Sequence, residues 1–385
     1  MNHGPWIWNS PGWPKLSYDA QTLEEPLRRA RMECGLLFGR AEAISTDDRL
    51  RVERDVWSGE AVATAAIEGE VLGLASVRSS VARRLGIDVS LTASLPRQVE
   101  GLLDVMESAA ADWDSELSAQ RLCRWQAALF PAGGSALRSI ETGRFRTHAD
   151  PMQIVSGPIG RESVHYVAPP SAAVPAETDR FLEWFNRTRD GSIDGVLRAG
   201  LAHVWFESIH PFEDGNGRVG RVVVDMALAQ DARRATRLHG VSSELRRRQH
   251  NYYDALNAAQ RGSGDVTDWL AWFTEVFTEA CRARAALIDE SLVRARFWQE
   301  HKHLALNERQ RKVLNRMLEA GPGGFEGGLT QRKYVGMTGA ASATAWRDID
   351  DLVGKGLLVK GAGAGRSTYY DLAIAGWGWM AGTGL

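Results

Sequence analysis

Apolar side chains recur every three or four positions through most of the chain, which is the spacing of one helix face. This pattern predicts helices over residues 22–44, 46–67, 71–85, 96–130, 176–188, 193–208, 216–230, 243–260 and 265–288. Two short runs of β-type residues, 153–157 and 164–167, are joined by Gly and Pro and predict a β-hairpin. The fold is therefore expected to be mainly α-helical.

The two ends of the chain show different patterns. Residues 1–18 are rich in Trp and Pro, which predicts an extended arm that packs on the rest of the fold. Residues 302–376 predict three helices followed by two strands around a Gly-rich turn, an order that resembles a winged helix. We therefore expect three parts: an arm and helical region (1–90), a helical core (91–295) and a winged-helix-like domain (302–376).

Composition narrows the class of protein. The 385 residues are 44 % hydrophobic and 24 % charged, with a net charge of −2. The percentages are those of an ordinary globular protein. The net charge close to zero excludes a protein whose whole surface binds nucleic acid. Cys34, Cys123 and Cys281 form no disulfide framework, which favours a reducing compartment. With no leader pattern at the start and no apolar run of about 18 residues, we expect a cytoplasmic protein that does not cross a membrane.

Residues 210–221 read His-Pro-Phe-Glu-Asp-Gly-Asn-Gly-Arg-Val-Gly-Arg and lie between two predicted helices. The stretch 214–217 has the composition of a tight turn. Such a turn at a helix N-terminus points several backbone N–H groups in one direction and can bind an anion. Arg218 and Arg221 lie three residues apart, share a helix face and can each bind a phosphate through two N–H groups.

Two further side chains of this segment suit chemistry on a polyphosphate. Asp214 offers the hard oxygen ligand that Mg²⁺ prefers. His210 can accept a proton near neutral pH. Together with the anion-binding turn and the two arginines, they form the set of groups that phosphoryl chemistry requires. The alternative is a Gly-rich turn with a structural histidine.

The segment 210–221 matches the Fic family signature H-P-F-x-D-G-N-G-R-x-x-R at every defined position, so the chain is identified as resembling that family. The resemblance implies a Fic fold and transfer of AMP from ATP to a Ser, Thr or Tyr hydroxyl of a protein. It implies the following roles: His210 as general base, Asp214 as Mg²⁺ ligand, Gly215, Asn216 and Gly217 as the phosphate-binding turn, and Arg218 and Arg221 as β- and γ-phosphate ligands. Phe212 is expected to be buried.

A second motif lies on the predicted helix 46–67. Thr64-Ala-Ala-Ile-Glu68-Gly69 resembles the inhibitory pattern [S/T]-x-x-x-E-[G/N] of a self-inhibited branch of the family. The resemblance implies that Glu68 pairs with Arg221 and keeps it from the γ-phosphate. Thr64 either orients this helix or is structural, and an ordinary helix end with a solvated Glu is the alternative for the whole motif. In some relatives the same glutamate supports removal of AMP, and the sequence does not select transfer over removal.

Two other segments gain a possible role from the resemblance. Gln153, Ile154, Val155, Ser156 and Gly157 resemble the flap that holds a target segment by strand addition; a plain hairpin is the alternative. Tyr252 and Tyr253 lie where relatives carry aromatic residues near the nucleotide, and two half-buried helix tyrosines are the alternative. His203 is expected to be a hydrogen-bonded core histidine.

The expected partners are ATP and a protein target, which includes the chain itself, and the sequence is compatible with a homodimer. The rival functions are AMP removal, transfer of another nucleotide or phospho-group, and a nucleotide-sensing DNA-binding regulator. Residues 302–376 carry a net charge of about +4, which permits DNA binding. Asp348, Asp350 and Asp351 on the third helix of this module argue against it, because they would repel phosphates.

Overall fold

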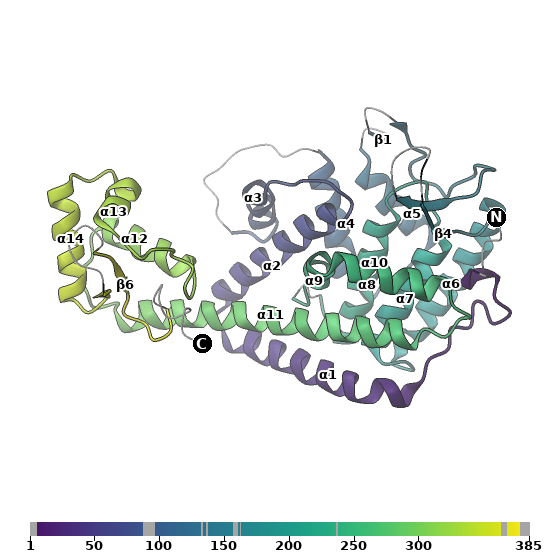
Figure 1. Cartoon of the computed structure of the whole chain (residues 1–385), viewed down its shortest axis with the longest axis horizontal. Coiled ribbons are helices and arrows are strands. Elements are labelled where there is room, and N and C mark those ends of the chain that lie inside the picture. The colour runs from purple at the N-terminus through teal and green to yellow at the C-terminus, as the bar shows by residue number, and fades with distance from the viewer. Residues whose placement is uncertain are drawn as a thin grey trace. The chain divides into compact units, whose positions relative to one another are not determined.

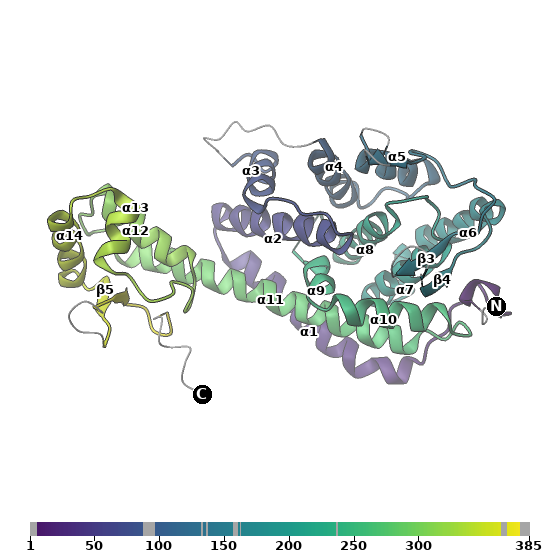
Figure 2. The same cartoon turned by 45° about the horizontal axis from the view of Figure 1, so that its top comes forward.

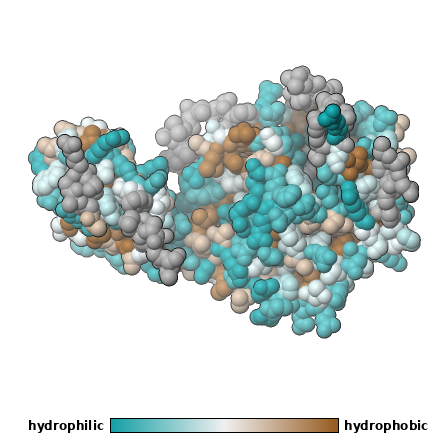
Figure 3. Space-filling model, in the orientation of Figure 1, coloured by the Kyte–Doolittle hydropathy of each residue, from teal (hydrophilic) through white to brown (hydrophobic). Residues whose placement is uncertain are grey.

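The computed structural model describes residues 6–87, 97–131, 134–135, 138–156, 161, 163–235, 238–362 and 368–377. The chain divides into two compact units, Met1–Ile288 and Asp289–Leu385. It passes from one to the other within the helix α11 (Thr267–Glu300) (Figure 1). No helix in the described ranges is long and apolar enough to cross a membrane. The face in Figure 3 mixes hydrophilic and hydrophobic residues over both units.

The first unit is mainly helical, as its sequence pattern predicts. Its other α-helices are α1 (Ala20–Ala43), α2 (Thr46–Ile67), α3 (Leu74–Arg84), α4 (Arg97–Ala111), α5 (Ala119–Leu129), α6 (Val174–Arg187), α7 (Gly195–Ile209), α8 (Asn216–Ala232), α9 (Val241–Arg247) and α10 (Gln249–Gln260). Short 3₁₀ turns lie at Ile7–Asn9, Ser171–Ala173 and Thr188–Asp190.

Three predicted helix ranges differ from the structure. The range 96–130 contains two helices, because the Ser118 side chain accepts a hydrogen bond from the Arg121 N–H and starts α5. The range 243–260 is also divided, at Arg248, whose backbone leaves the helical region. The last helix continues to Glu300 rather than ending near 288.

Helix α7 is the centre of the first unit. All fifteen of its residues are buried, and α8 packs along it. Because α7 ends at Ile209 and α8 begins at Asn216, the turn 210–215 lies where the two packed helices meet. Gly215 has φ of 86°, a value that glycine adopts without strain.

The end of α2 lies beside the start of α8 in both Figures 1 and 2. Ser45 starts α2 by accepting the Asp48 N–H, and Glu68 and Gly69 end it. Gly69 has φ of 80°, and the Glu70 N–H donates to the Ala65 carbonyl. This left-handed turn is a common helix ending, and it places Glu68 and Glu70 close together.

The predicted hairpin is present as β3 (Gln153–Ser156) and β4 (Ser163–Val167), which pair antiparallel with Ile154 opposite Tyr166. A second small hairpin joins β1 (Gly134–Ser135) and β2 (Arg138–Ser139). The Tyr166 hydroxyl donates to the Ser208 carbonyl at 2.7 Å and fastens β4 to α7. The predicted arm packs on this region, since the ring of Trp6 lies 5.3 Å from that of Tyr166.

The second unit contains α12 (Glu308–Glu319), α13 (Gln331–Thr338) and α14 (Ser342–Gly354), then the antiparallel strands β5 (Leu358–Lys360) and β6 (Tyr370–Leu372). Its core gathers apolar residues of all five elements, among them Val313, Tyr334, Ile349, Leu358 and Leu372. These elements agree in order with the sequence prediction for 302–376.

The three aspartates of α14 differ in their surroundings. Asp348 does not present its charge at the surface of α14, because it is 7 % exposed. Its carboxylate accepts hydrogen bonds from Arg309 at 2.8 Å and from the Tyr334 hydroxyl at 2.9 Å. Asp351 is paired with Lys355. Of the three acids expected to repel phosphates, two are therefore already neutralised by partners within the unit.

Packing between α4 and α5 depends on a glycine. A Cβ atom at Gly101 would overlap the backbone carbonyl of Ala128, whereas a Cβ at Gly35 in α1 would meet nothing within 4 Å. We expect Gly101→Ala to destabilise the first unit by about 1–3 kcal/mol through overpacking. Gly35→Ala should stabilise it by about 0.5–1 kcal/mol, since alanine favours the helix. Thermal unfolding of both variants checks this, and equal shifts would contradict it.

Candidate active site

The backbone around His210 is held in an uncommon conformation. His210 ends α7 with φ of 50°, in the left-handed region that few non-glycine residues adopt. The buried Arg146 side chain holds it there by donating from Nε to the His210 carbonyl at 2.8 Å. The Arg146 N–H also donates to the Pro211 carbonyl at 2.9 Å. Two hydrogen bonds from one residue therefore fix the direction in which the imidazole leaves the helix.

The turn after His210 is closed from inside. The Asn216 side chain accepts from the Phe212 N–H at 2.9 Å and donates to the Phe212 carbonyl at 2.8 Å. Phe212 is fully buried, as expected, with its ring 5.6 Å from that of Phe145. The Asn216 amide thus shapes the turn instead of facing outward. The N–H groups of the first turn of α8, which include Gly217, have no acceptor within the helix and suit an anion.

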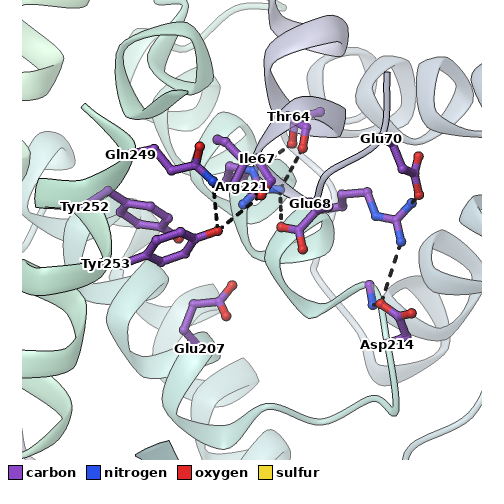
Figure 4. A network of polar contacts seen from close by, with 12 residues as sticks. Thr64, Ile67, Glu68, Glu70, Glu207, Asp214, Arg221, Gln249, Tyr252 and Tyr253 are labelled. Carbon is purple, nitrogen blue, oxygen red and sulfur yellow. Dashed lines mark hydrogen bonds and ion pairs between the residues drawn. The ribbon is translucent and has the colours of Figure 1, made fainter. Parts of the chain in front are cut away.

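Arg221 is buried and held by the end of α2 (Figure 4). Its guanidinium donates to Thr64 Oγ1 at 2.6 Å, to the Thr64 carbonyl at 3.1 Å and to Glu68 Oε1 at 2.7 Å. A Cβ atom at Gly217 would overlap Glu68 Oε1. The glycine of the turn therefore makes room for the carboxylate. The structure brings Thr64, Glu68, Gly217 and Arg221 together from segments about 150 residues apart.

Arg218 has a carboxylate partner that sequence reasoning missed. Its Nη1 lies 2.7 Å from Glu70 Oε1, and its Nη2 lies 3.8 Å from Asp214 Oδ1. The guanidinium also lies 4.8 Å from the ring centre of Phe130. The sequence feature that could have indicated this partner is an acid two residues after Glu68, on the other side of the turn at Gly69. Both arginines of the segment thus face acids from the end of α2.

The protonation states follow from burial and neighbouring charges. Burial lowers the pKa of His210 to about 4, and the charge of Arg146 adds to this, so the imidazole is neutral at pH 7. Burial raises the pKa of Glu207 to about 8, so that carboxyl is largely protonated at pH 7. Burial alone would also raise the pKa of Glu68, but the charge and hydrogen bond of Arg221 lower it. Glu68 is therefore a carboxylate paired with a cation.

The two tyrosines differ in environment. Tyr252 is buried, and its hydroxyl lies 2.9 Å from His203 Nε2. This confirms His203 as a hydrogen-bonded core histidine. Tyr253 is 40 % exposed, and its hydroxyl donates to the Ile67 carbonyl at 3.2 Å. Only Tyr253 therefore presents its ring at the edge of the site, next to the end of α2 (Figure 4).

The hairpin expected as a flap is linked to the site through α7. Among the described residues no hydrogen bond joins Gln153, Ile154, Val155 or Ser156 directly to the turn 210–215, and Gly157 lies outside the described residues. Val155 is 45 % exposed, so the strand has a solvent-facing side chain. The link is Tyr166 of β4, which bonds Ser208, two residues before His210.

The residues around Asp214 are compatible with Mg²⁺ held mainly by a substrate. No group of three or more His, Cys, Asp or Glu side chains in the described ranges could hold a metal ion alone. The Asp214 side chain is half exposed, and its Oδ1 accepts the Gly215 N–H at 2.6 Å. A single carboxylate beside an anion-binding helix end suits Mg²⁺, which usually keeps water and binds substrate phosphates.

Comparison with known proteins places this site in a family. Residues 116–228 match the Fic/DOC family, and residues 6–87 match a domain of unknown function, DUF4172. A solved Fic family protein from Desulfovibrio desulfuricans G20 has a TM-score of 0.50 and 20 % identity over 90 % of this chain and 95 % of that one. A Fic domain containing signaling protein from Bacteroides thetaiotaomicron has a TM-score of 0.50 and 17 % identity over 67 % of this chain and 97 % of that one.

Among curated proteins, a probable protein adenylyltransferase of Aquifex aeolicus is 32 % identical over 27 % of this chain and 29 % of its own length. The protein adenylyltransferase Fic of Culex quinquefasciatus is 28 % identical over 30 % of this chain and 22 % of its own length. The chain thus spans less than a third of these relatives. The fold and the 210–221 segment define a Fic domain. Residues 116–228 of this chain therefore form a Fic/DOC domain.

Proposed function

We propose that the chain is a protein adenylyltransferase, which transfers AMP from ATP to a Ser, Thr or Tyr hydroxyl of a protein. The observation that carries this proposal is the position of a neutral His210 at the start of an anion-binding turn that is followed by Arg218 and Arg221. Sequence similarity to protein adenylyltransferases over the matched segments supports the choice of ATP as donor.

In the proposed reaction, the unprotonated nitrogen of His210 accepts the proton of the target hydroxyl as its oxygen attacks the α-phosphorus of ATP. The bond from the α-phosphorus to the bridging oxygen breaks, and pyrophosphate leaves. The first-turn N–H groups of α8 bind the phosphates, and Arg218 and Arg221 balance their charge. Asp214 would hold Mg²⁺, which supplies further positive charge at the phosphates when it is bound.

The same site suggests why the chain would be held inactive. Arg221 is committed to Thr64 and Glu68, so it is not available to a γ-phosphate. ATP that cannot reach this arginine would bind without the in-line geometry that the attack requires. Glu68 is therefore proposed as an inhibitory residue, with Thr64 and Gly69 placing it.

The strand β3 and the second unit are the two remaining parts of the chain with a proposed role. We propose that β3 offers its edge to an extended target segment, which strand addition would align beside His210. The second unit would act as a winged-helix-like module for contact with a protein or with a second copy of the chain. DNA binding stays the less favoured role.

The test of the proposed function uses ATP labelled on the α-phosphate, with Mg²⁺, and the full chain carrying Glu68→Gly. Transfer of the α-label to protein, with no transfer from ATP labelled on the γ-phosphate, is the expected result. Transfer of the γ-label would indicate a kinase instead. No label from either ATP, with ATP binding measured separately, would favour another donor or AMP removal.

The Glu70–Arg218 pair yields a further prediction. Glu70 forms an ion pair with Arg218, which the proposed reaction needs for the phosphates. The Glu70 side chain is 44 % exposed, so solvent weakens this pair. We expect Glu70→Gln in the Glu68→Gly background to lower the KM for ATP by about 2–5-fold, consistent with an exposed ion pair worth up to about 1 kcal/mol. Glu42→Gln, which removes an exposed ion pair with Arg234, should leave the KM unchanged. An unchanged KM for the Glu70 variant would show that the pair does not compete with phosphate.

A further inference from the structure

Two buried polar atoms beside the proposed base lack hydrogen-bond partners. Among the described residues, neither Nδ1 of His210 nor Oε1 of Glu207 has a partner within hydrogen-bond geometry. Glu207 lies one helical turn before His210, and its Oε2 is 3.7 Å from His210 Nδ1. Buried polar groups in native proteins are nearly always paired, so two unpaired neighbours at a reactive site call for an explanation.

The fold makes specific room for this carboxyl group. Glu207 is 5 % exposed and lies at the contact between α7 and α8. A Cβ atom at Gly220 would overlap Glu207 Oε1. The absence of a side chain at 220, within the signature's undefined positions, therefore permits an acid to be buried there. Figure 4 shows Glu207 rising from α7 into the space beside Tyr253 and Glu68.

We propose that Glu207 is the positioning residue of His210, and that its carboxyl oxygen accepts a hydrogen bond from the Nδ1–H of the imidazole. This leaves Nε2 unprotonated for the target hydroxyl. A neutral imidazole carries one proton, and the hydrogen bond made by one ring nitrogen decides which nitrogen holds it. The two atoms are 3.7 Å apart, so the proposed hydrogen bond requires the two side chains to rotate until they are about 0.5 Å closer. The inference rests on the proposed function, in which His210 is the base.

The groups around Glu207 define the competing explanations. Arg221 of α8, Glu68 at the end of α2, His210 and Tyr252 of α10 all act electrostatically on Glu207 or respond to it. One competitor is the backbone carbonyl of Glu207, which also lies close enough to His210 to raise its pKa. The other is Arg221, which Glu207 would help to place for the nucleotide. Each predicts a different result when the side chain is changed.

The direct test measures which ring nitrogen of His210 carries the proton. Full-length protein labelled with ¹⁵N-histidine is examined at pH 7.5 by two-bond ¹H–¹⁵N NMR, with His210→Asn to assign the signal. We expect the proton on Nδ1 in the parent, a shift toward the Nε2–H form in Glu207→Leu, and the parent pattern in Glu207→Gln, which keeps an acceptor oxygen. An unchanged pattern in a folded Glu207→Leu variant would assign the role to the backbone carbonyl and overturn the proposal.

The kinetic test uses the Glu68→Gly background. We expect Glu207→Leu to lower kcat by about 10²-fold with an unchanged KM for ATP, because a misplaced base costs the chemical step. Glu207→Gln should restore most of that kcat. A raised KM with unchanged kcat would overturn the proposal in favour of a role on Arg221. If Glu68→Gly itself transfers no AMP, the proposed function fails, and the NMR result still decides the position of the His210 proton.

Glu60→Gln is the matched control for both tests. Glu60 is also a buried glutamate of the first unit, at 4 % exposure. It accepts hydrogen bonds from the Ser242 and Ser243 N–H groups at 2.6 Å and 3.0 Å, so its role is to start α9. This variant should lower the unfolding temperature and leave both kcat and the His210 proton unchanged. If kcat or the position of the His210 proton changed in this variant, the effects of the Glu207 variants would be attributed to lower overall stability.

Discussion

Replacing His210 by alanine in the Glu68→Gly background is expected to reduce AMP transfer by about 10²–10⁴-fold, the range that a general base contributes. The imidazole is buried and neutral at pH 7, so it is ready to accept a proton, and His210 is the residue of the 210–221 segment suited to that role. ATP binding should be retained, because the arginines and the helix N-terminus remain. The measurement is the initial rate of α-label incorporation with ATP affinity measured in parallel.

The control for this variant is His148→Ala. His148 is a half-buried histidine whose Nδ1 lies 2.8 Å from the Asp150 carbonyl, outside the 210–221 segment. It should transfer AMP at the parent rate. A His210→Ala variant that keeps more than about a tenth of the parent rate while folding normally would remove His210 from the role of base.

The Glu68→Gly variant is expected to transfer AMP about 10²-fold faster than the wild-type chain, because recovering the in-line geometry is worth about this much. The change removes the carboxylate 2.7 Å from Arg221 and frees its guanidinium to meet a γ-phosphate. The two Thr64 contacts remain, so a further Thr64→Val change should add to the effect. The measurement is the rate of α-label incorporation by each variant at saturating ATP.

Glu42→Gly is the matched control, because it removes an exposed glutamate paired with Arg234 outside the site. Its rate should equal that of the wild-type chain. Equal rates for the wild-type chain and Glu68→Gly would keep the transfer reaction and reject Glu68 as its inhibitor. The pair would then be structural, and the variant should instead show a lower unfolding temperature.

The segment 210–221 could be interpreted from sequence because its chemistry is local. Turn composition and the spacing of Arg218 and Arg221 along one helix need no knowledge of distant contacts. The Glu68–Arg221 contact was different, since 153 residues separate the partners and only family resemblance suggested it. The helix order of both units was equally accessible, because apolar periodicity reports the buried face of each helix.

The features that sequence reasoning missed all depend on tertiary contacts. Glu70 reads as an ordinary surface acid until the turn at Gly69 brings it to Arg218. Asp348 has the position of an exposed acid on a helix, yet Arg309 and Tyr334 compensate its burial. Local patterns do not encode such partners. The breaks within 96–130 and 243–260 were missed because one continuous apolar stripe covers both helices of each pair.

Gly217 lies where the Glu68 contact and the proposed phosphate-binding helix end meet. Its missing side chain leaves the space that the Glu68 carboxylate occupies, at the same helix end that would bind phosphate. In the proposed function, Glu68 is then a competitor tethered to its own site, and its effective concentration is set by the chain rather than by the amount of protein. Diluting the protein would not relieve such inhibition. Added ATP would compete with an effective concentration of Glu68 that does not change. Release would require a ligand or partner that moves the end of α2 itself.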